Sequence, residues 1–212
     1  MHYHAEIWLK TNKDVETQIE NILLPYDEQN KVMQETEEWT DNNGKPHKET
    51  YWTNPNGFYD WYQIGGRFTG SHDNYDPYKD RRNWRTCRLC EGTGYRNDTM
   101  GKEMREKDPS YTCNACGHYD HKKKQWTHGD TPQGMEVVWP TQFAKHEGDI
   151  IPVDQVTEDL TCYTLIISKD ILHIKEWTGE DFVKTGFDGK VKQKLNQLGI
   201  TDGYLVTVDY HS

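Results

Sequence analysis

Two pairs of cysteines constrain this chain more than any other feature of its sequence. The pairs Cys87/Cys90 (CRLC) and Cys113/Cys116 (CNAC) both have C-x2-C spacing, and twenty-two residues separate them. This is close to the spacing of a zinc ribbon, in which each pair occupies a tight turn and directs two thiolates at one ion. Four sulfur ligands that complete a tetrahedron favour structural Zn²⁺ over catalytic Zn²⁺, which needs an open position.

The cysteines also allow other interpretations. The four could be reduced thiols without a metal, or they could form disulfides, which are unexpected in a chain without a secretory signal. His118 or His121 could replace one thiolate as a ligand, although four cysteines make this unnecessary. Cys162 stands alone in the apolar stretch LTCYTLII, and we expect it to be a small buried hydrophobic residue.

Charge is distributed unevenly along the chain. The formal net charge is −10, which argues against a general nucleic-acid-binding protein. Residues 79–124 are the exception, because they carry 12 basic and 7 acidic groups. The run HKKK at 121–124 follows the second cysteine pair, and it is either a solvated edge or a contact for nucleic acid or an acidic protein. If the protein contacts nucleic acid, this basic, cysteine-containing module is the only part of the chain whose charge favours it.

The composition predicts a folded protein with a thin core. Hydrophobic residues make up 33% of the chain, and aromatic residues, which bury large areas, make up 12%. No apolar run approaches the roughly 18 residues that span a membrane, and MHYHAEIW does not resemble a signal peptide. We therefore expect an intracellular protein without membrane contact.

Periodicity predicts the order strand, helix, long insertion, strand, strand, helix, strand. Residues 3–9 alternate as in a half-buried strand, and Asp14 can cap a helix that stops near Pro25. Residues 27–57 and 95–110 lack apolar periodicity and are predicted as loops. The remaining predicted elements are strands at 135–139, 162–168, 171–177 and 204–211, and a helix between Asp188 and Gly199.

This order matches the β-α-β-β-α-β pattern of a ferredoxin-like α+β sandwich. We predict that residues 1–78 and 129–212 form this sandwich, and that a zinc-ribbon module of residues 79–128 interrupts it. The first and last strands would then be antiparallel neighbours, which brings His4 close to His211. One face of the sheet would be shared by His4, Glu6, Trp8, Thr207, Asp209 and His211.

The stretch Tyr59–Gly70 (YDWYQIGGRFTG) combines aromatic residues with two adjacent glycines and Arg67. Glycines weaken a strand, so Gly65 and Gly66 suggest a close approach of the backbone to another group. Arg67 can hold a phosphate or carboxylate in bidentate fashion, and the glycine amides could add donors.

Several segments of the sequence resemble segments of two known groups of proteins. CRLCEGTG resembles one C-x2-C-x-G-x-G unit of the DnaJ-type chaperone zinc domain. YHAEIWL, DWYQIGGRF and LVTVDYHS resemble the start, the central D-W-Y-x-x-G-G-R-W motif and the end of a group of uncharacterised proteins from tailed phages and related bacterial mobile elements. Phe68 replaces the usual Trp, and Tyr210 the usual Cys. The second resemblance implies a phage origin, the cytoplasm of a host cell, and a shared site at His4, Asp60, Trp61, Gly65, Gly66, Arg67, Asp209 and His211.

Three roles are open for this site. In the first, His4, Asp60 and His211 are catalytic candidates, and a ligand is bound by Arg67, Gly65, Gly66, Trp61, Trp8 and Asp209. In the second, the motif only plugs the sheet, with Asp60 and Arg67 paired and the two histidines paired across strands. In the third, the same face binds a protein.

Two functions follow from these roles. The first is a phage accessory protein, for example one that acts in counter-defence, that binds or cleaves a small anionic ligand such as a nucleotide on the sheet face. The second is a non-enzymatic module that blocks a host protein or nucleic-acid complex with its acidic surface or its basic zinc ribbon. No P-loop, G-x-S-x-G or H-E-x-x-H motif is present.

Overall fold

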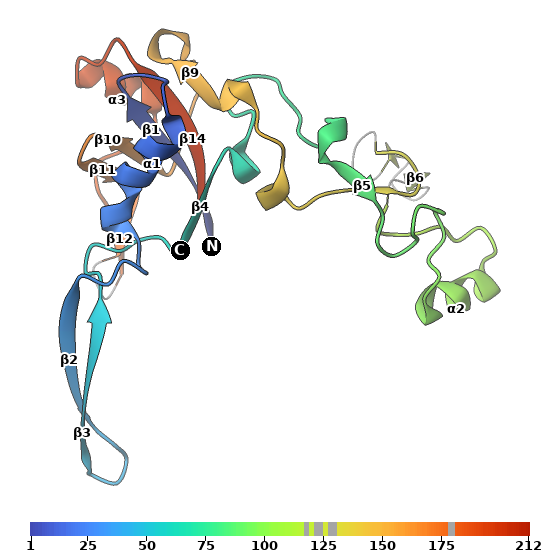
Figure 1. The fold of residues 1–212 in the computed structure, drawn as a ribbon, viewed down its shortest axis with the longest axis horizontal. Coiled ribbons are helices and arrows are strands. Elements are labelled where there is room, and N and C mark those ends of the chain that lie inside the picture. The colour runs from blue at the N-terminus through green and yellow to red at the C-terminus, as the bar shows by residue number, and fades with distance from the viewer. Residues whose placement is uncertain (117–118, 121–124, 127–130, 178–180) are drawn as a thin grey trace. The chain divides into compact units, whose positions relative to one another are not determined.

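A computed structural model describes the chain except for residues 117–118, 121–124, 127–130 and 178–180 (Figure 1). The chain forms two compact units. Unit 1 comprises Met1–His72 and Glu147–Ser212, and unit 2 comprises Asp73–His146. Among the described residues, no helix is long and apolar enough to cross a membrane.

Unit 1 contains the main sheet, with strand order β11-β10-β1-β14-β4 and with β9 also paired to β14. Its strands are β1 (His2–Leu9), β4 (Trp61–Ile64), β9 (Ile150–Pro152), β10 (Thr164–Ile167), β11 (Asp170–His173) and β14 (Tyr204–His211). Its helices are α1 (Val15–Leu23) and α3 (Val191–Gln197). Two further two-stranded sheets are β2 (Met33–Thr40) with β3 (Pro46–Thr53), and β12 (Lys175–Trp177) with β13 (Phe182–Lys184).

The predicted pairing of the first and last strands is confirmed. β1 and β14 are antiparallel over their full length, and His4 lies opposite Asp209 while His2 lies opposite His211. The two chain ends are hydrogen-bonded to each other, with Ser212 N 3.0 Å from Met1 O. The two ends of the chain therefore lie side by side (Figure 1).

The strand order of the main sheet differs from that of a ferredoxin-like sandwich. A split βαβ unit leaves room for a third strand between its two parallel strands, whereas β1 and β10 are direct parallel neighbours. The two helices also contribute to different core clusters. Ile19 of α1 packs with Ile166 and Val206, and Leu195 of α3 packs with Leu165 and Leu205.

Adjacent residues of a strand point to opposite faces, so α1 and α3 cover opposite faces of the sheet. The four residues of β10 (TLII) are all buried, as expected of a central strand covered on both sides. The prediction of a mixed α+β fold is confirmed. A cluster of buried apolar residues packs on each face of the sheet.

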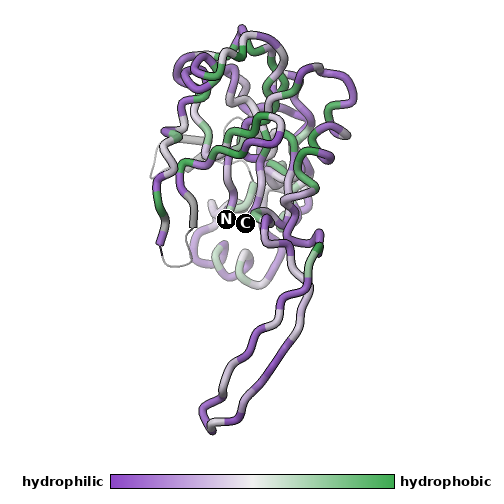
Figure 2. Tube along the Cα trace, turned by 90° about the vertical axis from the view of Figure 1, so that its left-hand side faces the viewer, coloured by the Kyte–Doolittle hydropathy of each residue, from purple (hydrophilic) through white to green (hydrophobic). Residues whose placement is uncertain are grey.

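The acidic segment 27–57 is not a loop. β2 and β3 pair over eight residues, from Met33 opposite Thr53 to Thr40 opposite Pro46, and they pair with no other described strand. The prediction failed because most residues on both faces of this hairpin are exposed, so no apolar alternation marks it. Figure 2 shows the hairpin as largely hydrophilic, while hydrophobic residues gather around the main sheet.

Unit 2 contains helix α2 (Thr99–Lys107) and the strands β5 (Trp84–Thr86), β6 (Tyr119–Asp120), β7 (Gln125–Trp126) and β8 (Met135–Val137). Residues 95–110 were predicted as a loop, but α2 lies within them. Asp98 caps this helix, because its carboxylate accepts a 2.9 Å hydrogen bond from Gly101 N. Only Gly101 of the helix is buried, which explains why no apolar stripe predicted it.

Candidate functional site

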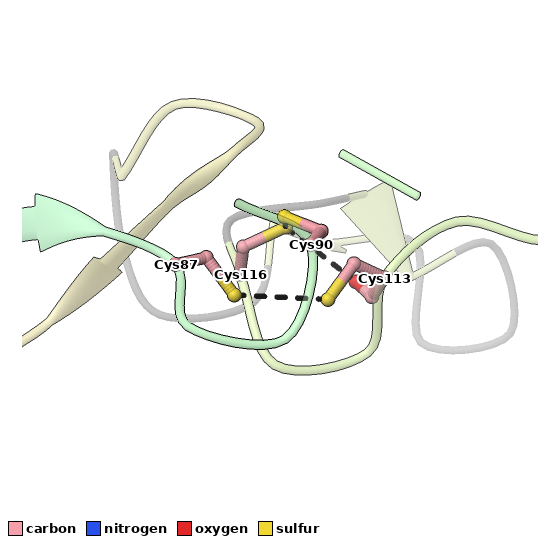
Figure 3. A group of neighbouring side chains, drawn as sticks. All are labelled: Cys87, Cys90, Cys113 and Cys116. Carbon is pink, nitrogen blue, oxygen red and sulfur yellow. Dashed lines mark hydrogen bonds between the residues drawn. The ribbon is translucent and has the colours of Figure 1, made fainter. Parts of the chain in front are cut away.

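The four cysteines of the two C-x2-C pairs form one buried cluster in unit 2 (Figure 3). Their sulfur atoms all lie within 4.8 Å of one another. Cys87 Sγ is 3.8 Å from Cys113 Sγ, and Cys90 Sγ is 4.0 Å from Cys116 Sγ. No disulfide is formed, since a disulfide bond measures only about 2.05 Å. The four cysteines can therefore hold one metal ion.

Backbone turns position the first cysteine pair. Glu91 N donates to Cys87 O at 2.8 Å, and Gly92 follows with a φ of 83°. Strand pairing of β5 with β8 fixes the chain just before Cys87, whose amide donates to Gly134 O at 2.9 Å. The other predicted ligands, His118 and His121, and the HKKK run at 121–124 lie outside the described residues.

The thiols differ in acidity. Burial raises the pKa of Cys113 to about 12, and burial also raises the pKa of Cys116. Burial has the same effect at Cys90, but hydrogen bonds, first that of the Gly94 amide, bring the pKa of Cys90 below its usual value. A cation that binds four thiolates must displace the protons of the less acidic thiols, so metal affinity decreases as pH falls.

A second group of polar residues lies on one face of the unit 1 sheet. Glu6 is fully buried, with His4 Nε2 2.7 Å from its Oε1 and His72 Nε2 3.2 Å from its Oε2. Thr207, opposite Glu6 on β14, donates to the same Oε1 at 2.9 Å. Next along β14, the buried Asp209 has its Oδ1 2.8 Å from His2 Nδ1.

Glu6 keeps its negative charge in spite of its burial. Burial alone would raise its pKa, but hydrogen bonds and charge interactions with His4 and His72 lower the pKa to about 2. A buried carboxylate that orients an imidazole is a common arrangement in acid–base sites. His4 also lines a cavity of about 250 Å³ together with Ser71, Thr157, Asp159, Leu160 and Thr161.

The double glycine lets the chain leave the sheet and fold back onto buried carboxylates. Gly65 N donates to Thr207 O at 2.8 Å, where β14 changes partner from β4 to β9. Gly65 and Gly66 have φ values of 73° and 56°. A Cβ on Gly65 would lie 2.2 Å from Asp149 Oδ2, and a Cβ on Gly66 would lie 2.5 Å from Asp209 Cβ.

Two aspartates hold this turn. Arg67 N donates to Asp209 Oδ2 at 3.0 Å, while Thr69 Oγ1 and Gly70 N donate to Asp149 at 2.6 and 2.8 Å. The glycines therefore serve close contact with carboxylates of the protein itself. The prediction that the backbone approaches another group is confirmed, and the groups are Asp149 and Asp209.

Arg67 and His211 form the exposed part of this region. The Arg67 side chain is exposed, and within the described part of the chain its guanidinium has no hydrogen-bond or ion-pair partner. Asp60 does not pair with it but binds His211, with His211 Nδ1 2.8 Å from Asp60 Oδ1. His2 connects the buried carboxylates to the exposed residues. Its Nδ1 binds the buried Asp209, and its ring centroid is 5.3 Å from that of His211 and 5.7 Å from that of Trp61.

The structure thus brings most of the predicted site residues together. Trp8 is the exception, since it packs with the α3 core and donates its Nε1 hydrogen to Asp202 O at 2.9 Å. The sequence analysis missed His2, His72 and Asp149. His2 precedes His4 by one strand alternation and could have been found, whereas His72 and Asp149 follow no periodic pattern.

A larger cavity, of about 860 Å³, lies on the opposite face of the sheet. Its lining includes four Tyr and Phe side chains and comprises Tyr3, Pro55, Asn56, Gly57, Phe58, Tyr163, His173, Lys175, Tyr210 and Ser212. Tyr3 and Tyr210 also belong to or pack against the α1 core, so part of this lining is structural.

Comparison with protein-family models, with curated proteins and with solved structures finds no match for this chain.

Proposed function

We propose that the protein is a phage accessory protein in which unit 1 binds a small anionic ligand, such as a nucleotide, beside Arg67. The observation that carries this proposal is the exposed guanidinium of Arg67, which has no partner among the described residues and lies on a turn whose backbone is fixed by Asp209. An arginine held in this way can form bidentate hydrogen bonds to a phosphate with little loss of backbone freedom.

Asp209, which binds Arg67 N, also binds His2, whose ring centroid lies 5.3 Å from that of His211, and these two histidines support the same proposal. His2 and His211 each have Nδ1 bound to a carboxylate, which fixes the ring and leaves Nε2 for a ligand. The Trp61 ring, which is half-buried, offers a surface on which a base can stack. If the ligand is also cleaved, His211 and His4 are the groups that can transfer protons near neutral pH.

Titration calorimetry with AMP and with inorganic phosphate tests the proposal. We expect Arg67→Ala to weaken AMP binding by about ten-fold or more, because charge-assisted hydrogen bonds contribute about 1.5–3 kcal/mol. Arg81→Ala, which removes an exposed arginine from unit 2, should leave the affinity unchanged. Equal affinity of the wild type and Arg67→Ala, or no binding of either probe, contradicts the proposal.

We also propose that the metal held by unit 2 is structural Zn²⁺. Zn–S bonds of about 2.3 Å in a tetrahedron place the sulfur atoms about 3.8 Å apart, which agrees with the two sulfur–sulfur distances in the cluster. All four cysteines are buried, so no position is open for a substrate. Elemental analysis of the folded protein should give about one zinc per chain, and metal-free folded protein contradicts this proposal.

A second candidate function is an interaction module that blocks a host protein or nucleic-acid complex. The β2–β3 hairpin favours it, because the hairpin pairs with no other described strand and exposes Trp39, Tyr51 and Trp52. Aromatic residues of this kind are enriched in protein interfaces.

A further inference from the structure

The two faces of the β2–β3 hairpin differ in charge. Residues directly opposite each other in the register share a face, so eight residues form what we call the acidic–aromatic face. These residues are Met33, Glu35, Glu37, Trp39, His47, Glu49, Tyr51 and Thr53. The face contains three glutamates and neither lysine nor arginine.

On the opposite face of the hairpin, the two charged residues pair with each other and two threonines lie within hydrogen-bonding distance. Glu38 pairs with Lys48 at 2.5 Å, and Thr36 Oγ1 lies 3.0 Å from Thr50 Oγ1. On the acidic–aromatic face, by contrast, Glu37 lies directly opposite Glu49, an arrangement of like charges that destabilises a strand pair. The repulsion therefore does not serve the stability of the hairpin.

Exposed aromatic and sulfur-containing side chains accompany these glutamates. Met33, Trp39 and Tyr51 are 42%, 43% and 41% exposed. Trp39 stacks on His47, with ring centroids 5.4 Å apart, which holds its indole flat at the end of the face. Tyr51 donates to Glu35 at 3.4 Å, and its pKa is raised by desolvation and by the charges of Glu35, Glu37 and Glu49.

We propose that the acidic–aromatic face docks an arginine-rich segment of another protein. Guanidinium groups bind carboxylates in bidentate fashion and stack on the faces of Trp and Tyr, so one residue type satisfies both components of the face. Phosphate-bearing partners are repelled by the three glutamates, which directs the proposal to a basic protein segment.

The base of the hairpin holds this face at a fixed place on unit 1. Asn54 is 7% exposed, and its side-chain amide donates to Pro25 O and Asp27 O at 2.8 and 2.9 Å. Two-stranded hairpins are only marginally stable alone, and these bonds connect β3 to the segment that follows α1. The β2–β3 hairpin is thus fixed at its base, and most of its residues are exposed to solvent.

The proposal rests on the second candidate function and is independent of the Arg67 site. It is tested with a nona-arginine peptide as probe, with nona-lysine for comparison, by fluorescence titration of the full chain. We expect the triple variant E35Q/E37Q/E49Q to bind nona-arginine about ten-fold more weakly, because electrostatic complementarity is lost. The control E16Q/E20Q/E158Q changes net charge equally on unit 1 outside the hairpin, and it should bind like the wild type.

Two further variants separate docking from general attraction. Trp39→Ala should weaken nona-arginine binding several-fold, whereas Trp52→Ala, on the opposite face and 53% exposed, should not. Arg67→Ala should bind the peptide normally, and the triple glutamine variant should bind AMP normally, so the two functional proposals can fail separately.

Stability distinguishes this role from a structural one. Removing the like charges of Glu37 and Glu49 should leave amide exchange in residues 33–40 and 46–53 unchanged or slower, although binding is lost. The proposal is overturned if the triple variant retains nona-arginine affinity, if its charge-matched control loses as much, or if its hairpin exchanges faster.

Discussion

The two units are stabilised by different kinds of groups. Unit 1 buries apolar side chains on both faces of a sheet, from α1 on one side and α3 on the other. In unit 2, the buried cluster consists of four cysteines, with Ala115 packed against them. With so little apolar burial among its described residues, unit 2 is expected to depend on a bound metal, because a small hydrophobic core cannot offset the conformational entropy lost on folding.

The buried acidic side chains of the two units also have different partners. Unit 1 buries Glu6, Asp149 and Asp209, which bind histidines and hold the glycine turn on the sheet. The described part of unit 2 buries one acidic side chain, Glu136, which is 8% exposed and binds Arg85 and Arg88 at 2.7 and 3.0 Å. In unit 1 the buried carboxylates therefore bind histidines and backbone amides, whereas in unit 2 the buried carboxylate forms ion pairs with two arginines.

Loss of one cysteine ligand should have the largest effect. We expect Cys113→Ser to unfold unit 2, because the free energy of metal binding is folding free energy in small metal-dependent units. Cys162→Ala, which removes the buried cysteine of unit 1, is the matched control and should leave unit 2 folded. Limited proteolysis followed by mass spectrometry reports the result. Cleavage spread equally over both units would show that they share one core.

Acid should destabilise unit 1 through Glu6. Its folded pKa of about 2 lies below the usual value of 4.5, so its stabilisation is fully present above about pH 4.5 and is lost as pH falls toward 2. The difference corresponds to about 3 kcal/mol. Unfolding of the Cys113→Ser protein by urea, monitored by hydrogen exchange in β1 and β14, separates this effect from the effect of metal loss. Glu6→Gln should flatten the pH dependence, and an unchanged slope would contradict the assignment.

The glycine turn offers a smaller test of how unit 1 is held. Gly66→Ala should cost about 2 kcal/mol more than Gly199→Ala, since both positions have positive φ but only Gly66 meets a neighbouring side chain. Chemical denaturation of the two variants measures the difference. Equal costs would mean that Asp209 moves aside and does not define the turn.

The Arg67 side chain should contribute least to stability. Arg67→Ala removes an exposed group without a partner in the described residues, so its free energy of unfolding should stay within about 0.5 kcal/mol of the wild type. Asp209→Asn, which weakens the bonds to His2 and to Arg67 N, should be clearly more destabilising. A large loss in Arg67→Ala alone would favour the structural interpretation of the motif.

The sequence was most informative where chemistry or periodicity is local. The cysteine spacing, the alternation of β1 and β14 and the spacing of Val15, Ile19 and Leu23 predicted the corresponding elements. The hairpin was missed because most residues on both of its faces are exposed, so no alternation of apolar and polar residues marks its strands. The ferredoxin-like arrangement was wrong because alternation indicates that a strand has two faces but does not indicate which helix covers each.

The candidate site could be predicted only in part for similar reasons. Residues on β1 and β14 share a face by register, so His4 and Asp209 were predicted together. Asp149 comes from a 3₁₀ turn, Glu147–Asp149, far along the chain, and no local pattern connects it to Gly65. The structural role left open by the sequence paired Asp60 with Arg67, whereas the register places Trp61 opposite His211 and brings Asp60 to that histidine.

Hydrogen exchange with and without a chelator tests the difference between the units most directly. The full chain is measured first with its metal and then after removal of the metal at neutral pH. We predict that residues 84–86, 99–107 and 135–137 lose protection on chelation, while β1, β10 and β14 keep theirs. Equal loss of protection in both units, or unchanged protection in unit 2, would contradict the conclusion that the cysteine centre stabilises unit 2 alone.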